Sequence, residues 1–218
     1  MNLAIVIPAL NEAAMISAVV AAVVPFGRVI VVDDGSTDDT GLLAAKAGAE
    51  VVRNEGPHGY DAALARGYAK AAEIGCDTIA TIDGDGQIGA EALSQAIEKK
   101  RDDSVEIVIG VRDHQARWSE RLFSCYVRLR YAVPDILCGL KIFPIELYLA
   151  HKSLAETESV NTALALVALR NGARVALSPV QVRAREDSSR FGSFLRANFK
   201  ILRVFVSVIV ADLFHSKR

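Results

Sequence analysis

Short β-rich runs alternate with longer helical stretches along the first half of the chain. Five runs rich in valine, isoleucine and threonine are expected to form strands, at residues 3–7, 28–32, 50–53, 78–82 and 107–109. Alanine-rich or helically spaced segments lie between them, at residues 13–23, 42–47, 61–74 and 90–99. Strands that alternate with helices at this spacing predict an α/β fold with a Rossmann-like, mainly parallel central sheet flanked by helices.

Polar loops follow three of these strands. Pro8 is expected to close the first strand, because proline has no amide hydrogen for pairing. Right-handed crossovers would bring the loops at residues 8–12, 33–40 and 83–87 together at the carboxyl edge of the sheet. Ligands bind at this edge in open α/β folds. The pattern therefore predicts a crevice lined by acidic loops.

The regular alternation of predicted strands and helices ends in the second half of the chain. A helix-like stretch at residues 114–133 interleaves arginines with aromatic residues, and a strand-like run follows at 135–143. A helix is expected at 161–170, and a strand at 174–182 with Pro179 near its edge. No linker separates the halves, so we expect one domain over residues 1–192, followed by an amphipathic helix over 193–218.

Composition narrows the class of protein. The chain has 218 residues, of which 51% are hydrophobic and 23% charged, as in a globular domain. Its net charge of −1 gives no electrostatic reason to expect nucleic acid as a partner. The three cysteines have no metal-binding spacing and are expected to be free thiols, which favours a cytoplasmic location. The apolar stretch at 204–211 is far shorter than the ~20 residues of a spanning helix, so none is expected.

Two aspartates crowd the end of the fourth strand. Asp83 and Asp85 are separated by Gly84 in "TIDGDGQ", and adjacent carboxylates repel each other unless a cation lies between them. Turns also favour Asp and Gly, so a plain loop is the alternative. Mg²⁺ binds few protein carboxylates and takes its other ligands from phosphates and water. With the side-chain oxygen of Gln87, the pattern fits a metal–diphosphate site.

The second strand also ends in acids, in "VVDDGSTDDT". Acids here can cap a helix and interact with its dipole. Alternatively, a carboxylate such as Asp34 can accept hydrogen bonds from a nucleobase or a ribose hydroxyl. No GxGxxG follows the first strand and no GxxxxGK[ST] occurs, so the dinucleotide-binding fingerprint and the P-loop are both excluded.

Taken in order, the motifs resemble those of a known enzyme family. "VIPALNE", "VVDDGSTDDT", "NEGPHGYDAALARGYAKAAEIGCD", "TIDGDGQIGAEAL", "GVR" and "DILCGLKIF" have the order and spacing of family 2 glycosyltransferases with the GT-A fold. Within that family the chain is most similar to the polyprenyl-phosphate, or dolichol-phosphate mannose synthase-like, branch. The resemblance covers roughly residues 3–192.

The resemblance implies a donor site. Asp83, Asp85 and Gln87 would hold Mg²⁺ or Mn²⁺ against the diphosphate of a UDP- or GDP-linked sugar. The expected lining of the nucleoside pocket is Pro8, Leu10, Asn11, Glu12, Asp34, Gly59 and Ala63.

It also implies an acceptor side. Arg112 would reach a donor or acceptor phosphate, and Asp135 would serve as general base or orient the acceptor. For Asp135 a cap or a salt bridge to Lys141 is the structural alternative. The phosphate-gripping residues implied by "VRAREDSSRFG" are Arg185, Ser188, Ser189 and Arg190.

Three features, at four positions, depart from the branch. Ile88 replaces a histidine, Leu140 replaces a phenylalanine, and Asn161 and Ala163 replace an acidic pair. These changes leave the donor residues intact and bear on the acceptor. We expect an inverting, metal-dependent glycosyltransferase acting on a polyprenyl-phosphate or other lipid-linked acceptor. The alternatives are a soluble saccharide or growing glycan as acceptor, and a catalytically silent nucleotide-sugar binding protein.

The C-terminal stretch bears on the acceptor as well. The expected basic stripe is Arg196, Lys200 and Arg203, and the expected apolar face is Phe199, Leu202, Phe205, Val206 and Ile209. A basic amphipathic helix of this kind can lie among lipid headgroups, which predicts peripheral contact with the cytoplasmic face of a membrane. The alternative is a helix docked on the domain's own sheet or on a second subunit in a homo-oligomer.

Overall fold

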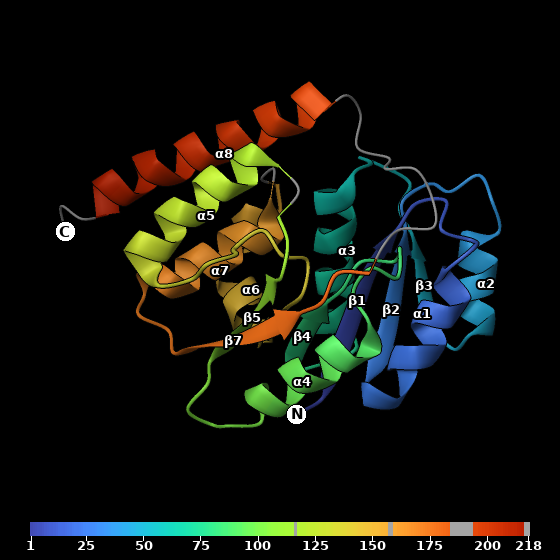
Figure 1. Cartoon of the computed structure of the whole chain (residues 1–218). Coiled ribbons are helices and arrows are strands. Elements are labelled where there is room, and N and C mark those ends of the chain that lie inside the picture. Colours follow the sequence, from blue (N-terminus) through green and yellow to red (C-terminus); the bar gives the residue numbers. More distant parts are fainter. Residues whose placement is uncertain (116, 157–158, 184–193, 216–218) are drawn as a thin grey trace.

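The computed structural model describes residues 1–115, 117–156, 159–183 and 194–215. Its centre is a seven-stranded sheet with the order β3-β2-β1-β4-β6-β5-β7 (Figure 1). The strands are β1 (Leu3–Ala9), β2 (Arg28–Asp33), β3 (Glu50–Arg53), β4 (Thr78–Thr81), β5 (Ile107–Arg112), β6 (Lys141–Pro144) and β7 (Val175–Val180). All neighbouring pairs are parallel except those of β6, which runs antiparallel to β4 and β5. The expected mainly parallel sheet is confirmed.

Helices cover both faces of the sheet. On one face, the buried cluster joins the sheet to α3, α5, α6, α7 and α8, and on the other to α1, α2 and α4. The helices are α1 (Ile16–Val23), α2 (Thr40–Lys46), α3 (Tyr60–Glu73), α4 (Ala90–Lys100), α5 (Trp118–Tyr131), α6 (Ile145–Ala150), α7 (Val160–Arg170) and α8 (Phe194–His215). Two short 3₁₀ helices complete the set, η1 (Val24–Phe26) and η2 (Lys152–Glu156).

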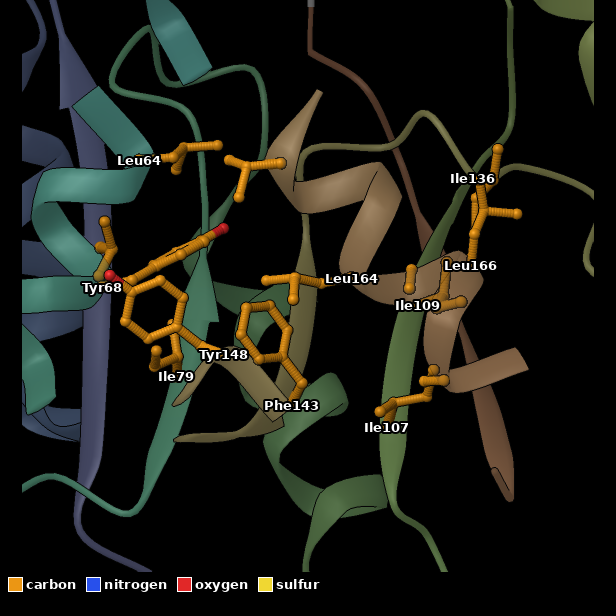
Figure 2. Packing of buried hydrophobic residues seen from close by; sticks show 14 of the residues in the cluster. Leu64, Tyr68, Ile79, Ile107, Ile109, Ile136, Phe143, Tyr148, Leu164 and Leu166 are labelled. Atoms are coloured by element: carbon orange, nitrogen blue, oxygen red, sulfur yellow. The ribbon is translucent and has the colours of Figure 1, made fainter. Parts of the chain in front are cut away.

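Strand β1 divides the core. Its side chains alternate, so that Val6 packs with the α3 side while Ile5 and Ile7 pack with the α1 side. Helix α3 lies very close to this strand, because a Cβ atom at Gly67 would overlap Val6 Cγ1. The ring of Tyr68, a residue of α3, meets two other aromatic rings edge-on in the cluster shown in Figure 2.

Several expected boundaries need correction. Pro8 does not end β1, which pairs with β2 as far as Ala9. Pairing with β4 stops at Val6, so Pro8 lies where the strand has only one partner, a position that tolerates a missing amide hydrogen. The run at 135–143 is a strand only from Lys141, where β6 begins. Helix α6 was not expected from the sequence. Pro179 lies near the end of β7, as predicted, and β7 is an edge strand of the sheet.

Helix α8 packs along α5 at one end of the molecule (Figure 1). Phe205 lies 5.1 Å from Phe123 between ring centroids, and the buried Asn198 Oδ1 accepts a hydrogen bond from Ser119 Oγ at 2.6 Å. The C-terminal helix therefore docks on its own domain, mainly through α5. Among the described residues, no helix has the length and apolar character needed to cross a membrane.

Candidate active site

Hydrogen bonds join the loops that follow β1 and β2 at the carboxyl edge of the sheet. Asn11, with a left-handed φ of 49°, donates its amide N–H to Ser36 Oγ at 2.9 Å. Its side-chain oxygen accepts from the Thr37 amide at 2.8 Å. The Glu12 amide donates to Thr40 Oγ1 at 2.7 Å. These bonds bring the expected nucleoside-pocket loops together into one surface.

The buried carboxylate of Asp34 ties the third loop to the same edge. Asn54 Nδ2 donates to Asp34 Oδ1 at 2.6 Å, and the Gly59 amide donates to Asp34 Oδ2 at 2.7 Å. Asp33, which the sequence prediction did not include, accepts hydrogen bonds from the Ser36 amide and from Arg53 Nη1, both at 2.8 Å. The two acids thus shape the pocket by holding its loops.

The acidic pair after β4 lies at this edge too. Burial, and after it the negative charge of Asp85, raise the pKa of Asp83 above its ordinary range. Tyr60 opposes the shift by donating its hydroxyl to Asp83 Oδ1 at 2.9 Å. Asp85 Oδ1 accepts from the Gln87 amide at 3.0 Å, which makes a tight turn of the acidic motif.

These residues fit a divalent cation whose remaining ligands come from a substrate. The described part of the chain has no group of three or more His, Cys, Asp or Glu side chains arranged to hold a metal. Two carboxylates that repel each other suit Mg²⁺ or Mn²⁺ when phosphate oxygens and water complete the coordination. The side chain of Gln87 donates its Nε2 to the Arg183 carbonyl oxygen at 3.4 Å. A bound cation would also reverse the repulsion that raises the pKa of Asp83.

Asp135 and Arg112 have a different arrangement from the one expected. Arg112 Nε donates to Asp135 Oδ2 at 2.7 Å and Nη2 donates to Oδ1 at 3.0 Å, while Glu120 Oε2 lies 3.3 Å from Nη2. Asp135 is 0% exposed. Asp135 is therefore a buried ion-pair partner of Arg112 in this structure, and its role as general base or acceptor-orienting residue stays a prediction. The salt bridge predicted as the alternative is present, but with Arg112 in place of Lys141.

Lys141 is a buried cation that sequence reasoning did not assign to the site. Its Nζ donates to the carbonyl oxygen of Cys138 at 2.6 Å. Burial lowers the pKa of Lys141 to about 8, while the negative charges of Asp135 and Asp83 act in the opposite direction. A lysine in the otherwise apolar run "CGLKIF" was the available signal.

The remaining predicted residues divide into three groups. Leu10 is exposed and Pro8 is buried beside Gly84, both at the carboxyl end of β1. Ala63 is a correction, because its side chain is buried in the core on the α3 side of the sheet. Arg185, Ser188, Ser189 and Arg190 lie outside the described residues.

Two residues that depart from the family pattern, Ile88 and Asn161, pack or form hydrogen bonds inside this structure. Ile88 is buried and forms an isolated β-bridge with Val182. Asn161 is also buried, and its Nδ2 donates to Thr81 Oγ1 and to the Gly139 carbonyl, each at 3.1 Å. Asn161 therefore supports the backbone at Gly139, which lies against Asp83.

Solved structures with this architecture include glucosyl-3-phosphoglycerate synthase from Mycobacterium tuberculosis. Its complex with Mn²⁺, UDP and glucosyl-3-phosphoglycerate has a TM-score of 0.75 and 23% identity, over 96% of this chain and 79% of that chain. Its complex with Mg²⁺ and UDP has a TM-score of 0.74 and 23% identity, over 94% and 79%. This likeness confirms the predicted GT-A fold.

Sequence relatives give the family. An uncharacterized glycosyltransferase of Mycobacterium bovis is 38% identical over 50% of this chain and 47% of its own length, so the match spans about half of that relative. A UDP-N-acetylglucosamine–dolichyl-phosphate N-acetylglucosaminyltransferase of Methanococcus voltae is 26% identical over 90% of this chain and 92% of its own. Residues 4–121 match the model of glycosyl transferase family 2. The chain belongs to glycosyl transferase family 2.

Proposed function

We propose that the protein is an inverting, metal-dependent glycosyltransferase that moves a sugar from a UDP- or GDP-linked donor to a polyprenyl-phosphate or other lipid-linked phosphate. The observation that carries the proposal is the acidic pair Asp83 and Asp85, which lies at the same sheet edge as the Asp34 pocket. The metal- and UDP-bound complexes of structures with this fold support the donor class. The first complex also holds glucosyl-3-phosphoglycerate, which is not a lipid, so it does not support a lipid-linked acceptor.

In this proposal the loops at the carboxyl edge of the sheet have separate tasks. The loops held by Asp34 would orient the nucleoside, and Asp85 and Gln87 would face the diphosphate through a divalent ion. That ion would neutralise the charge that develops on the departing nucleoside diphosphate. An acceptor oxygen that approaches the anomeric carbon from the opposite face inverts its configuration.

The Arg112–Asp135 pair favours a phosphate acceptor over a sugar hydroxyl. A hydroxyl acceptor needs a general base, and the acid predicted for that role is buried against Arg112. A phosphate monoester has a second pKa near 6, so its oxygen is already ionised at neutral pH. Positioning then accounts for more of the lowered barrier than proton removal does.

The outward faces of α5 and α8 favour a lipid as the carrier of that phosphate. We call them the α5/α8 outer surface. Glu120 and Asp212, the acids of these two helices, are both buried, so the described surface has no exposed carboxylate. Its exposed apolar residues are Trp118, Leu122, Leu129, Phe199, Val206, Val210 and Leu213. Its exposed basic residues are Arg121, Arg128, Arg130, Lys200 and Arg203.

Such a surface is complementary to an anionic lipid headgroup layer. Each basic residue near an anionic leaflet contributes about 1 kcal/mol to binding. Phe205 of the predicted apolar face packs inward instead, while Phe199 and Val206 point outward. The dolichyl-phosphate acceptor in the name of the Methanococcus voltae relative supports the same choice.

Turnover with defined donors tests the chemistry. The full chain is incubated with Mn²⁺ and a panel of UDP- and GDP-sugars, and donor hydrolysis and transfer to a short polyprenyl phosphate are both measured. Transfer to the lipid phosphate with inversion is expected. Transfer only to a soluble saccharide would replace the lipid acceptor by the alternative acceptor. A folded protein that binds UDP with Mn²⁺ but turns over no donor would be a silent binding protein.

Vesicle flotation tests the lipid-facing surface. Deleting residues 193–218 would be a poor test, because α8 buries Phe205 and Val208 against the domain. A double substitution, Val206→Glu with Val210→Glu, changes only exposed positions. The wild type should float with phosphatidylglycerol vesicles at low salt, and the double variant should not. Leu42→Glu, at an exposed position of α2 in the other half of the molecule, is the matched control and should float normally.

A further inference from the structure

Tyr60 contacts the acidic motif but has no assigned task in the proposed reaction. It is the first residue of α3, and its hydroxyl donates to Asp83 Oδ1 at 2.9 Å. The residue is 39% exposed. The other carboxylate oxygen of Asp83 lies over Gly139, where a Cβ atom would be only 2.5 Å away. The carboxylate is thus held between a phenol and a glycine backbone.

The residues on both sides of Tyr60 are anchored. The Gly59 amide donates to Asp34 Oδ2 at 2.7 Å. Asp61 Oδ1 accepts from the Val160 amide at 3.1 Å, and Asp61 Oδ2 lies 3.5 Å from Lys200 Nζ. The start of α3 is therefore fixed to the nucleoside pocket, to α7 and to α8. A side chain supported in this way can hold a partner in one orientation.

We propose that Tyr60 is a positioning residue that orients the Asp83 carboxylate for the divalent cation, an inference that rests on the proposed function. Hydrogen bonds from neighbouring groups fix the orientation of metal-binding carboxylates in proteins. An ionised carboxylate has about four acceptor sites, so one bond from Tyr60 leaves capacity for a cation.

A phenol suits this task better than a basic side chain. A lysine or arginine at position 60 would neutralise the carboxylate and weaken its attraction for a cation, whereas the tyrosine hydroxyl is neutral. Tyr60 therefore fixes the geometry of Asp83 and preserves its charge.

Binding of Mn²⁺ in the presence of UDP, without turnover, tests this inference. The electron paramagnetic resonance signal of free Mn²⁺ is measured in a solution of the full chain, and its decrease reports binding. Tyr60→Phe removes only the oxygen and should weaken Mn²⁺ affinity about tenfold, the low end of the effect for groups that orient metal ligands. Tyr126→Phe is the matched control, since Tyr126 donates to Asp212 Oδ2 at 2.8 Å in the α5–α8 contact. Its Mn²⁺ affinity should equal that of the wild type.

The outcomes separate the inference from the proposed function. If Tyr60→Phe binds Mn²⁺ within twofold of the wild type, Tyr60 does not position Asp83 and the inference is wrong, while the proposed function stands. If Tyr60→Leu alone loses affinity, the ring matters and the hydroxyl does not, which also overturns it. If the wild type binds no Mn²⁺ in the presence of UDP, the proposed function and the inference both fail.

Discussion

Replacing Asp135 by asparagine should cost stability before it affects chemistry. Asp135 Oδ2 accepts from the Arg112 amide at 3.2 Å and from Nε at 2.7 Å, and Oδ1 accepts from Nη2 at 3.0 Å. The carboxylate is fully buried. Asparagine keeps one acceptor oxygen but removes the charge, so the guanidinium of Arg112, which is only 20% exposed, loses its main counter-charge.

The loss in the free energy of unfolding depends on the ion pair that Arg112 keeps. Breaking a buried ion pair by removing one partner costs about 3–5 kcal/mol. Glu120 stays 3.3 Å from Arg112 Nη2, so we expect the low end, about 3 kcal/mol. In a chain of this size, each kcal/mol lowers the midpoint of thermal unfolding by about 2–4 °C, so the drop should be roughly 6–12 °C.

Thermal unfolding and donor binding, measured on the same preparations, check this prediction. Glu98→Gln is the matched control, because its ion pair with Arg101 at 2.6 Å is exposed and should be worth less than about 1 kcal/mol. Asp135→Asn should bind UDP with Mn²⁺ normally at a temperature where it is folded. An unfolding midpoint within 1 °C of the wild type, combined with a hundredfold loss of turnover, would refute the structural role and restore Asp135 as the base.

Three further predictions concern other residues. The folded-state pKa of Lys141 is about 8, below its ordinary 10.5, so the unfolded chain binds more protons between these values and stability should rise with pH there. Between pH 7.5 and 9, urea unfolding should show a gain of about 1 kcal/mol that Lys141→Met lacks, and an equal gain in both proteins would contradict this. Asp85→Ala should abolish Mn²⁺-dependent UDP binding, measured by calorimetry, without changing the unfolding midpoint; retained binding would disprove its assignment. Gly67→Ala should lose about 1–3 kcal/mol of unfolding free energy, because the added methyl group overpacks α3 against β1. Gly139→Ala should instead displace Asp83 and weaken Mn²⁺ binding. The reverse pattern in unfolding and Mn²⁺ titrations would show that these contacts are misassigned.

The sequence predicted the first half of the fold well, because local and global signals agree there. The strands from β1 to β5 are short β-branched runs, and each acidic loop follows the strand that was expected to carry it. The second half was harder. The run at 135–143 is apolar throughout, and periodicity alone does not separate a buried turn from a strand. Only its last part pairs in β6, after a turn that contains Asp135.

Predictions about the site were limited by long-range partners. The shared location of Asp34, Asp83 and Asp85 follows from alternating strands and helices, because right-handed crossovers bring the carboxyl ends of parallel strands to one edge. The partner of Asp135 depends on where β5 ends relative to the turn before β6. That arrangement places Arg112, and not Lys141, against the Asp135 carboxylate. Tyr60 followed a glycine in a loop, with no local sign that its hydroxyl would reach Asp83.

Helix α8 shows why an amphipathic pattern cannot decide between a membrane and a protein surface. The pattern counts apolar residues on one face, but this helix has two: Phe205 and Val208 point into the domain, while Val206 and Val210 point outward. Asp212, which the pattern places among polar residues, is buried and accepts hydrogen bonds from two tyrosines of α5 and from Arg170. Those donors come from helices more than 40 residues away in sequence, so no local window includes them. Docking on α5 uses the inner face, and it leaves the outer face available for a lipid surface, so the two alternatives that the sequence set against each other are compatible.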